Sequence, residues 1–173
     1  MSSSFDLSIE SPVSAEQVFS AFADEDYWHA RLASYTAGTG RLESLVTNAD
    51  GNVTVSTTVS LLRDRLPKLI TQLVGGDMKI VWDEAWAVIG PSRARGDIRI
   101  AMVRTPISGF GTALVTPAGR GSLLKYTATV EVKVPLVGGK MEKYIGGQLA
   151  VPIRRIQGFT TEWIMNHADT DSE

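Results

Sequence analysis

Glu84 is the residue whose type and neighbours come closest to a chemical function. The segment from Met78 to Val88 alternates as a β-strand does, so Trp82, Glu84 and Trp86 share one face. A carboxyl buried among aromatic side chains tends to keep its proton, and a neutral acid can donate a hydrogen bond or act as a general acid. The pattern also fits a carboxylate paired with an arginine or a backbone amide, or a bulge that exposes it to water.

Tyr126 is the second candidate, because it lies on the expected inner face of another alternating segment, at about residues 122–134. Its hydroxyl can donate or accept a hydrogen bond, although a tyrosine in such a position more often serves as core. Together, Glu84 and Tyr126 would suit a cyclase- or dehydratase-like reaction.

Other catalytic chemistry has little support. His29 and His167 are the two histidines, and neither has a partner at metal-ligand spacing. The absence of cysteine excludes thiolate nucleophiles, disulfides and Cys-bound zinc. There is no Gly-x-Ser-x-Gly motif, and the glycine-rich pieces at 109–111 and 137–140 do not match a phosphate-binding loop. The sequence therefore predicts no metal and no cofactor.

Composition narrows the class of protein further. The chain has 173 residues, 43% hydrophobic and 21% charged, which is typical of one folded domain. Its formal net charge is -2 and its basic residues are scattered, which argues against nucleic acid as a partner. No apolar run is long enough for a transmembrane segment, and the first residues lack signal-peptide features, so we expect a cytoplasmic protein. Nothing in the sequence specifies an oligomeric state.

The elements that position these residues can be predicted from local patterns. Phe5 to Ile9 alternates as a strand, Pro12 ends it, and Ser14 with Gln17 forms a capping box for a helix. Asp24 can cap a second short helix. Alternating or turn-bounded segments predict six further strands, at about residues 35–47, 53–61, 78–88, 95–103, 109–116 and 122–134.

The end of the chain predicts a long helix. From Gly138 onward, apolar residues recur every three or four positions over some 25 residues. Gly146-Gly147 and Pro152 weaken this helix, and we expect a kink near Gln148. The stretch 63–76 predicts a long connection with about one helical turn, of the kind that can act as a lid.

This order of elements resembles the helix-grip fold of the START, Bet v 1 and polyketide cyclase superfamily. The resemblance covers residues 4–166, as a single domain with flexible ends at 1–3 and 167–173, and the chain is most similar to an uncharacterised bacterial branch of unknown function. The residues that support the resemblance are Ile9 to Val13 with Val18-Phe19, Asp24 to Trp28, Trp82 to Trp86, and the terminal helix. It implies an α+β fold in which a curved seven-stranded antiparallel sheet and two short helices surround a long helix, with an apolar cavity between them. It implies no reaction.

From the predicted cavity face we expect binding, carriage or sensing of an apolar or amphipathic small molecule, such as a lipid, polyketide or isoprenoid-like compound. The alternatives are the cyclase- or dehydratase-like enzyme and a protein-interaction module with a filled core. The residues expected to line the cavity are Trp82, Glu84, Trp86, Ile98, Ile100, Met102, Phe110, Tyr126, Met141, Ile145 and Leu149.

Overall fold

The computed structural model describes residues 2–36, 38–72 and 76–168 of the chain. Within them, seven antiparallel strands form one sheet in the order β1-β7-β6-β5-β4-β3-β2. The strands are β1 (Ser2–Ser11), β2 (Gly38–Thr47), β3 (Val53–Leu61), β4 (Met78–Gly90), β5 (Arg93–Met102), β6 (Ile107–Ala118) and β7 (Gly121–Val132). The helices are α1 (Ala15–Phe22), α2 (Glu25–Ala33), the 3-10 turn η1 (Arg63–Arg65), α3 (Lys68–Thr71), α4 (Gly138–Gln148) and α5 (Ala150–Ala168).

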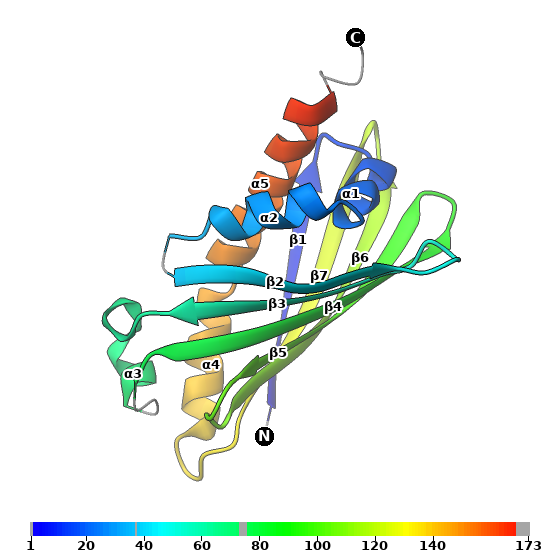
Figure 1. The fold of residues 1–173 in the computed structure, drawn as a ribbon. Coiled ribbons are helices and arrows are strands. Elements are labelled where there is room, and N and C mark those ends of the chain that lie inside the picture. The colour runs from blue at the N-terminus through cyan, green and yellow to red at the C-terminus, as the bar shows by residue number, and fades with distance from the viewer. Residues whose placement is uncertain (1, 37, 73–75, 169–173) are drawn as a thin grey trace.

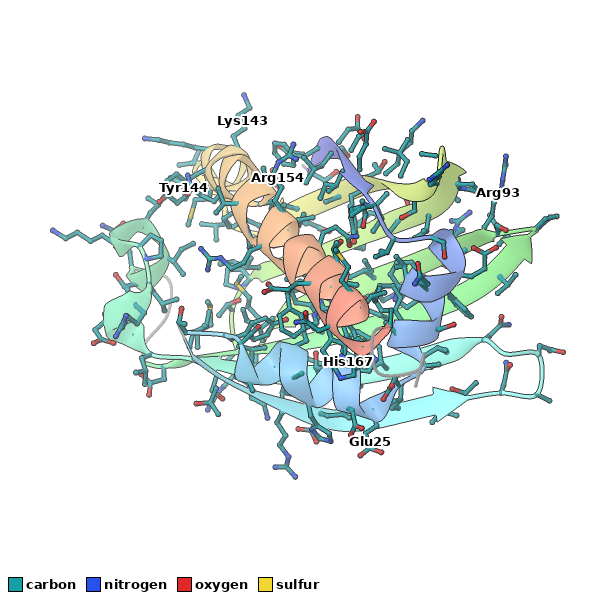
Figure 2. All side chains as sticks on the ribbon, turned by 90° about the horizontal axis from the view of Figure 1, so that it is seen from above. Glu25, Arg93, Lys143, Tyr144, Arg154 and His167 are labelled. Carbon is teal, nitrogen blue, oxygen red and sulfur yellow. The ribbon has the colours of Figure 1, made fainter. Side chains whose placement is uncertain are left out.

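The sheet is strongly curved, and the helix pair α4 and α5 lies across its concave face (Figure 1). The short helices α1 and α2 pack beside α5 at one end of that face. Seen from above, Lys143 and Tyr144 extend from α4 into solvent on the side away from α1 and α2 (Figure 2). The predicted α+β helix-grip fold is thus confirmed. Regular structure extends beyond the predicted 4–166 at both ends, while residues 1 and 169–173 lie outside the described part.

Local sequence signals account for the helix boundaries. Ser14 Oγ accepts a hydrogen bond from the Gln17 amide at 3.2 Å, and Gln17 Oε1 accepts one from the Ser14 amide at 2.9 Å, which completes the predicted capping box. Asp24 caps α2 through the amide of Asp26. Both helix starts are therefore confirmed.

The C-terminal helix breaks where the sequence predicts. One helix ends at Gln148 and the next begins at Ala150. Pro152 has no amide hydrogen to offer the carbonyl of Gln148, so the helical bonds resume with the Ile153 amide and the Leu149 carbonyl. The connection between β3 and β4 contains η1 and the single turn α3, as expected, and its residues 73–75 lie outside the described part.

Phe110, which is expected from the sequence to line the cavity, has its side chain on the outer face of β6. Phe110 pairs with Arg99 of β5, an outward-facing residue, and 57% of Phe110 is exposed. The inner positions of β6 instead carry Ile107, Gly109, Gly111, Ala113 and Val115. Because two of these are glycines, the inner face lacks the side chains that reveal strand alternation. The sequence pattern therefore assigned the outer-face residues of this strand to the inner face.

Gly146 allows α4 to approach β1 closely. A Cβ built at Gly146 would overlap the ring of Phe5, whereas one at the neighbouring Gly147 would meet nothing within 4 Å. Gly146 is therefore required for packing against Phe5, whereas its neighbour Gly147 is not.

This difference can be measured by urea unfolding. We expect Gly146→Ala to lower the free energy of unfolding by about 1–3 kcal/mol, because the Phe5 ring must move. Gly147→Ala is the matched control and should raise it by up to about 1 kcal/mol, because alanine favours the helix. A stabilising effect of both substitutions would contradict the close approach.

Candidate functional site

A pocket of about 200 Å³ lies between the inner face of the sheet and the helices α4 and α5. Its walls are almost entirely apolar. The predicted residues that border it are Trp82, Ile98, Ile100, Met102, Phe110, Tyr126, Ile145 and Leu149, joined by others including Ile80, Ile107, Pro152, Ile153 and Ile156. Met141 does not border it but is buried in the core between α4 and β7, and Trp86 lies farther toward α1.

Small residues on two neighbouring strands create the space. Gly111 of β6 pairs directly with Ala128 of β7, and Gly109 is the next inner position along β6. Because these positions carry a methyl group or no side chain, the helices resting on the larger surrounding residues cannot fill the volume above them. Phe110 borders the pocket between the two glycines although its side chain belongs to the outer face.

A second space of about 20 Å³ adjoins the pocket toward α2, and we call it the polar compartment. It shares Trp82, Ile98, Tyr126, Ile153 and Ile156 with the pocket. Its other bordering residues are Phe22, Arg31, Glu84, Trp86, Gln157 and Thr160. The arrangement is thus an apolar pocket with a small polar end.

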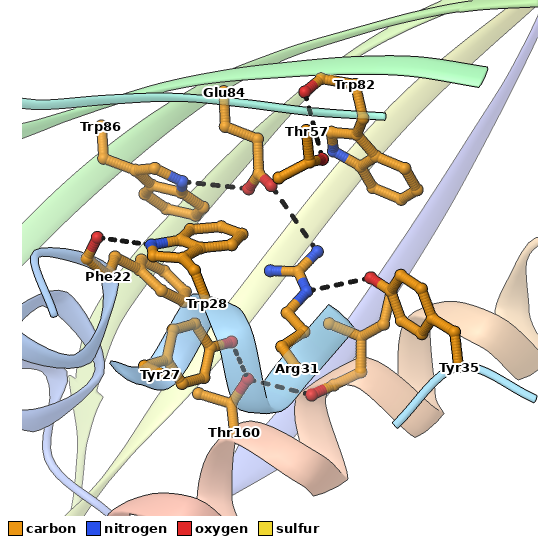
Figure 3. Close-up of polar contacts among 11 residues, drawn as sticks. Phe22, Tyr27, Trp28, Arg31, Tyr35, Thr57, Trp82, Glu84, Trp86 and Thr160 are labelled. Carbon is orange, nitrogen blue, oxygen red and sulfur yellow. Dashed lines mark hydrogen bonds and ion pairs between the residues drawn. The ribbon is translucent and has the colours of Figure 1, made fainter. Parts of the chain in front are cut away.

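Glu84 lies at the centre of this polar end, with only 4% of its surface exposed (Figure 3). Trp86 Nε1 donates a hydrogen bond to Glu84 Oε1 at 3.1 Å. An Arg31 guanidinium nitrogen lies 3.6 Å from Glu84 Oε2, close enough for an ion pair and too long for a hydrogen bond. Of the interpretations of Glu84 drawn from the sequence, the geometry matches the carboxylate paired with an arginine.

Arg31 was missed by sequence reasoning. Its guanidinium lies 4.7 Å from the centroid of the Trp28 ring and 5.8 Å from that of Trp82, and its Nε donates to the Tyr35 hydroxyl. Burial by itself would lower the pKa of Arg31, but the oxygens of Tyr27 and Glu84 outweigh burial and raise it, so the group stays charged. One signal was available, because Arg31 occupies a position on the buried stripe of α2.

Tyr27 and Thr160 fix the position of α2, which carries Arg31. Thr160 Oγ1 donates to the carbonyl of Ile156 at 2.9 Å, so the Tyr27 hydroxyl is the donor in its 2.6 Å hydrogen bond to Thr160. Burial raises the pKa of Tyr27, which keeps this donor protonated. The bond ties α2 to α5, and Thr160 borders the polar compartment (Figure 3).

Several polar atoms around the compartment lack a hydrogen-bond partner among the described residues. These buried atoms are Trp82 Nε1, Glu84 Oε2 and Gln157 Nε2. Burial, and then the charge of Glu84, raise the pKa of Tyr126, so its hydroxyl is neutral at physiological pH. Gln157 was also missed, although it continues the inward stripe of Ile153 and Ile156 on α5.

Metal-ligand clusters and membrane-spanning helices are both absent from the described part of the chain. In the described part of the chain, no group of three or more His, Cys, Asp or Glu side chains is placed to hold a metal ion. His29 instead pairs with Glu25 on the surface of α2. Among the helices described, none combines the length and hydropathy required to span a bilayer.

Comparison with known proteins places the chain among uncharacterised relatives. The model of a family described as a protein of unknown function (DUF2505) matches residues 6–164. An uncharacterised protein of Mycobacterium tuberculosis is 36% identical over 173 residues, which cover 96% of this chain and 99% of that protein.

Solved structures share the fold at low sequence identity. Ara h 8.0201 has a TM-score of 0.59 at 14% identity, covering 96% of this chain and 99% of the other. A START superfamily protein from Mycobacterium smegmatis has a TM-score of 0.53 at 15% identity, covering 92% of this chain and 98% of the other. The chain therefore belongs to the DUF2505 family, and its fold is the helix-grip fold of the START and Bet v 1 superfamily.

Proposed function

We propose that the protein binds a small, largely apolar molecule in the pocket beneath α4 and α5 and acts as its carrier or sensor. The observation that carries the proposal is the pocket of about 200 Å³ with almost wholly apolar walls and polar groups at one end. Mostly hydrophobic walls with a few placed polar groups are typical of small-molecule sites. The START-like fold supports the same conclusion at the level of architecture.

The volume favours a compact ligand. A protein cavity of about 150 Å³ lined by aliphatic and aromatic side chains takes up benzene. A pocket of about 200 Å³ therefore suits a fused ring system or a short isoprenoid- or polyketide-like molecule better than a lipid with two long acyl chains.

Binding without chemistry is favoured over the cyclase- or dehydratase-like alternative. That alternative requires Glu84 to deliver a proton to a substrate, but both of its carboxyl oxygens already face groups of the protein, an indole N–H and a guanidinium. Tyr126, whose pKa is raised by burial, is a poor source of a base at neutral pH. The filled-core interaction module is disfavoured by the pocket itself.

Titration with indane, a neutral bicyclic hydrocarbon, tests the proposal. Calorimetry of the folded protein should show one indane bound per chain. Ala128→Phe places a ring in the pocket and should weaken indane binding at least tenfold, because little volume is left. Ala101→Phe, the matched control, places the same ring on the exposed outer face of β5 and should leave binding unchanged.

Thermal unfolding of both variants verifies that each is folded. Absence of indane binding to the wild-type protein, or equal losses in the two variants, would overturn the pocket as the binding site.

A further inference from the structure

We propose that the polar compartment is a recognition site for a single uncharged hydroxyl group on the ligand. This inference rests on the proposed function, because the hydroxyl must belong to a molecule whose apolar body occupies the pocket. It adds a chemical requirement that the apolar pocket alone does not impose.

The first argument is the set of buried polar atoms that make no hydrogen bond. Among the described residues, Trp82 Nε1 and Gln157 Nε2 are buried donors without an acceptor, and Glu84 Oε2 is a buried acceptor without a donor. Glu84 is 4% exposed and Gln157 is 2% exposed, so bulk water does not satisfy them. All of these residues border the same compartment. Buried polar atoms are normally hydrogen-bonded, and their gathering around one space indicates that the space receives a polar group.

The second argument is size and position. A volume of about 20 Å³ holds one group the size of a water molecule or a hydroxyl, and a carboxylate is too large. Trp82 and Tyr126 border both the compartment and the pocket, so a hydroxyl in the first can be joined directly to a ring in the second.

The third argument is hydrogen-bond chemistry. A hydroxyl can donate to Glu84 Oε2 while it accepts from Trp82 Nε1 or Gln157 Nε2. A carbonyl can only accept, and it would leave Glu84 Oε2 without a hydrogen-bond donor. A ligand carboxylate would be repelled by Glu84, and an ammonium by the charged Arg31 and the two N–H donors. The hydroxyl is the group that uses both the donors and the acceptor.

Four probes with one ring system separate these possibilities: indane, 2-indanol, indane-2-carboxylate and 2-aminoindane. Calorimetry at pH 7 should show 2-indanol binding about tenfold more tightly than indane, as expected for the net gain of about two hydrogen bonds. Both charged probes should bind more weakly than indane. In ¹⁵N-labelled protein, 2-indanol should shift the indole N–H resonance of Trp82, which Trp82→Phe identifies by removing it.

Variants locate the selectivity. Trp82→Phe and Gln157→Leu each remove one donor and should reduce the preference for 2-indanol over indane to threefold or less. Trp163→Phe, the matched control, removes an indole N–H outside the compartment and should keep the tenfold preference. Thermal unfolding shows that each variant is folded. The preference is the ratio of the two affinities in the same variant, so a change in pocket size that affects both probes does not alter it.

The outcomes distinguish the two proposals. Equal affinity for indane and 2-indanol would overturn the hydroxyl site and leave the proposed function standing. Tighter binding of either charged probe than of 2-indanol would also overturn it. Failure of both neutral probes to bind would overturn the proposed function and this inference together.

Discussion

Replacing Arg31 with methionine is expected to lower the free energy of unfolding by about 3–5 kcal/mol, because it leaves the buried carboxylate of Glu84 without its counter-ion. Arg31 and Glu84 are each 4% exposed, and 3.6 Å separates their charged atoms. Methionine keeps a long apolar side chain between the Trp28 and Trp82 rings, so the loss reports mainly on the charge. Urea unfolding, monitored by circular dichroism, measures this loss in the free energy of unfolding.

Two comparisons make the interpretation specific. Arg95→Met removes an exposed arginine that lies 3.4 Å from Asp97, and little change is expected because solvent screens that pair. The double variant Arg31→Met/Glu84→Gln should recover part of the stability lost in Arg31→Met, because no buried carboxylate remains and glutamine still offers an oxygen to Trp86 Nε1. A double variant less stable than Arg31→Met alone would contradict the uncompensated-charge explanation.

Replacing Trp86 with alanine should have a similarly large effect, about 3–5 kcal/mol, because its side chain is close-packed core. Trp86 is 2% exposed, its ring centroid lies 4.6 Å from that of Phe22, and the ring covers Gly96 so closely that a Cβ there would lie 2.8 Å from it. Trp82 shares the same strand face but borders the pocket. Trp82→Ala should cost less than half as much, because part of its ring contacts no packed neighbour.

Urea unfolding of the two alanine variants under identical conditions provides the test. Trp82→Ala should also enlarge the pocket and admit a bulkier hydrocarbon than indane, whereas Trp86→Ala should not. Equal losses of stability would show that the Trp82 ring is packed as fully as that of Trp86, and would contradict its assignment to the pocket wall.

Much of the fold follows from interactions between residues close in sequence. Alternation along β4 places Trp82, Glu84 and Trp86 on one face because strand side chains repeat every two residues. The capping box at Ser14 depends on atoms three residues apart. The helix break follows from Pro152 and the carbonyl four residues before it. Each of these features was predictable because its physical cause is local.

The candidate site depended on contacts that no local pattern contains. The partner of Glu84 comes from α2, and sequence order alone does not say that α2 folds over β4. The orientation of β6 was lost because Gly109 and Gly111 carry no side chain to mark the inner face, and only pairing with β5 and β7 decides it. The polar compartment exists because Arg31, Glu84 and Gln157 arrive from three separate elements at one buried point. Tertiary packing decides such a meeting, because burial and hydrogen-bond pairing act through space and not along the chain.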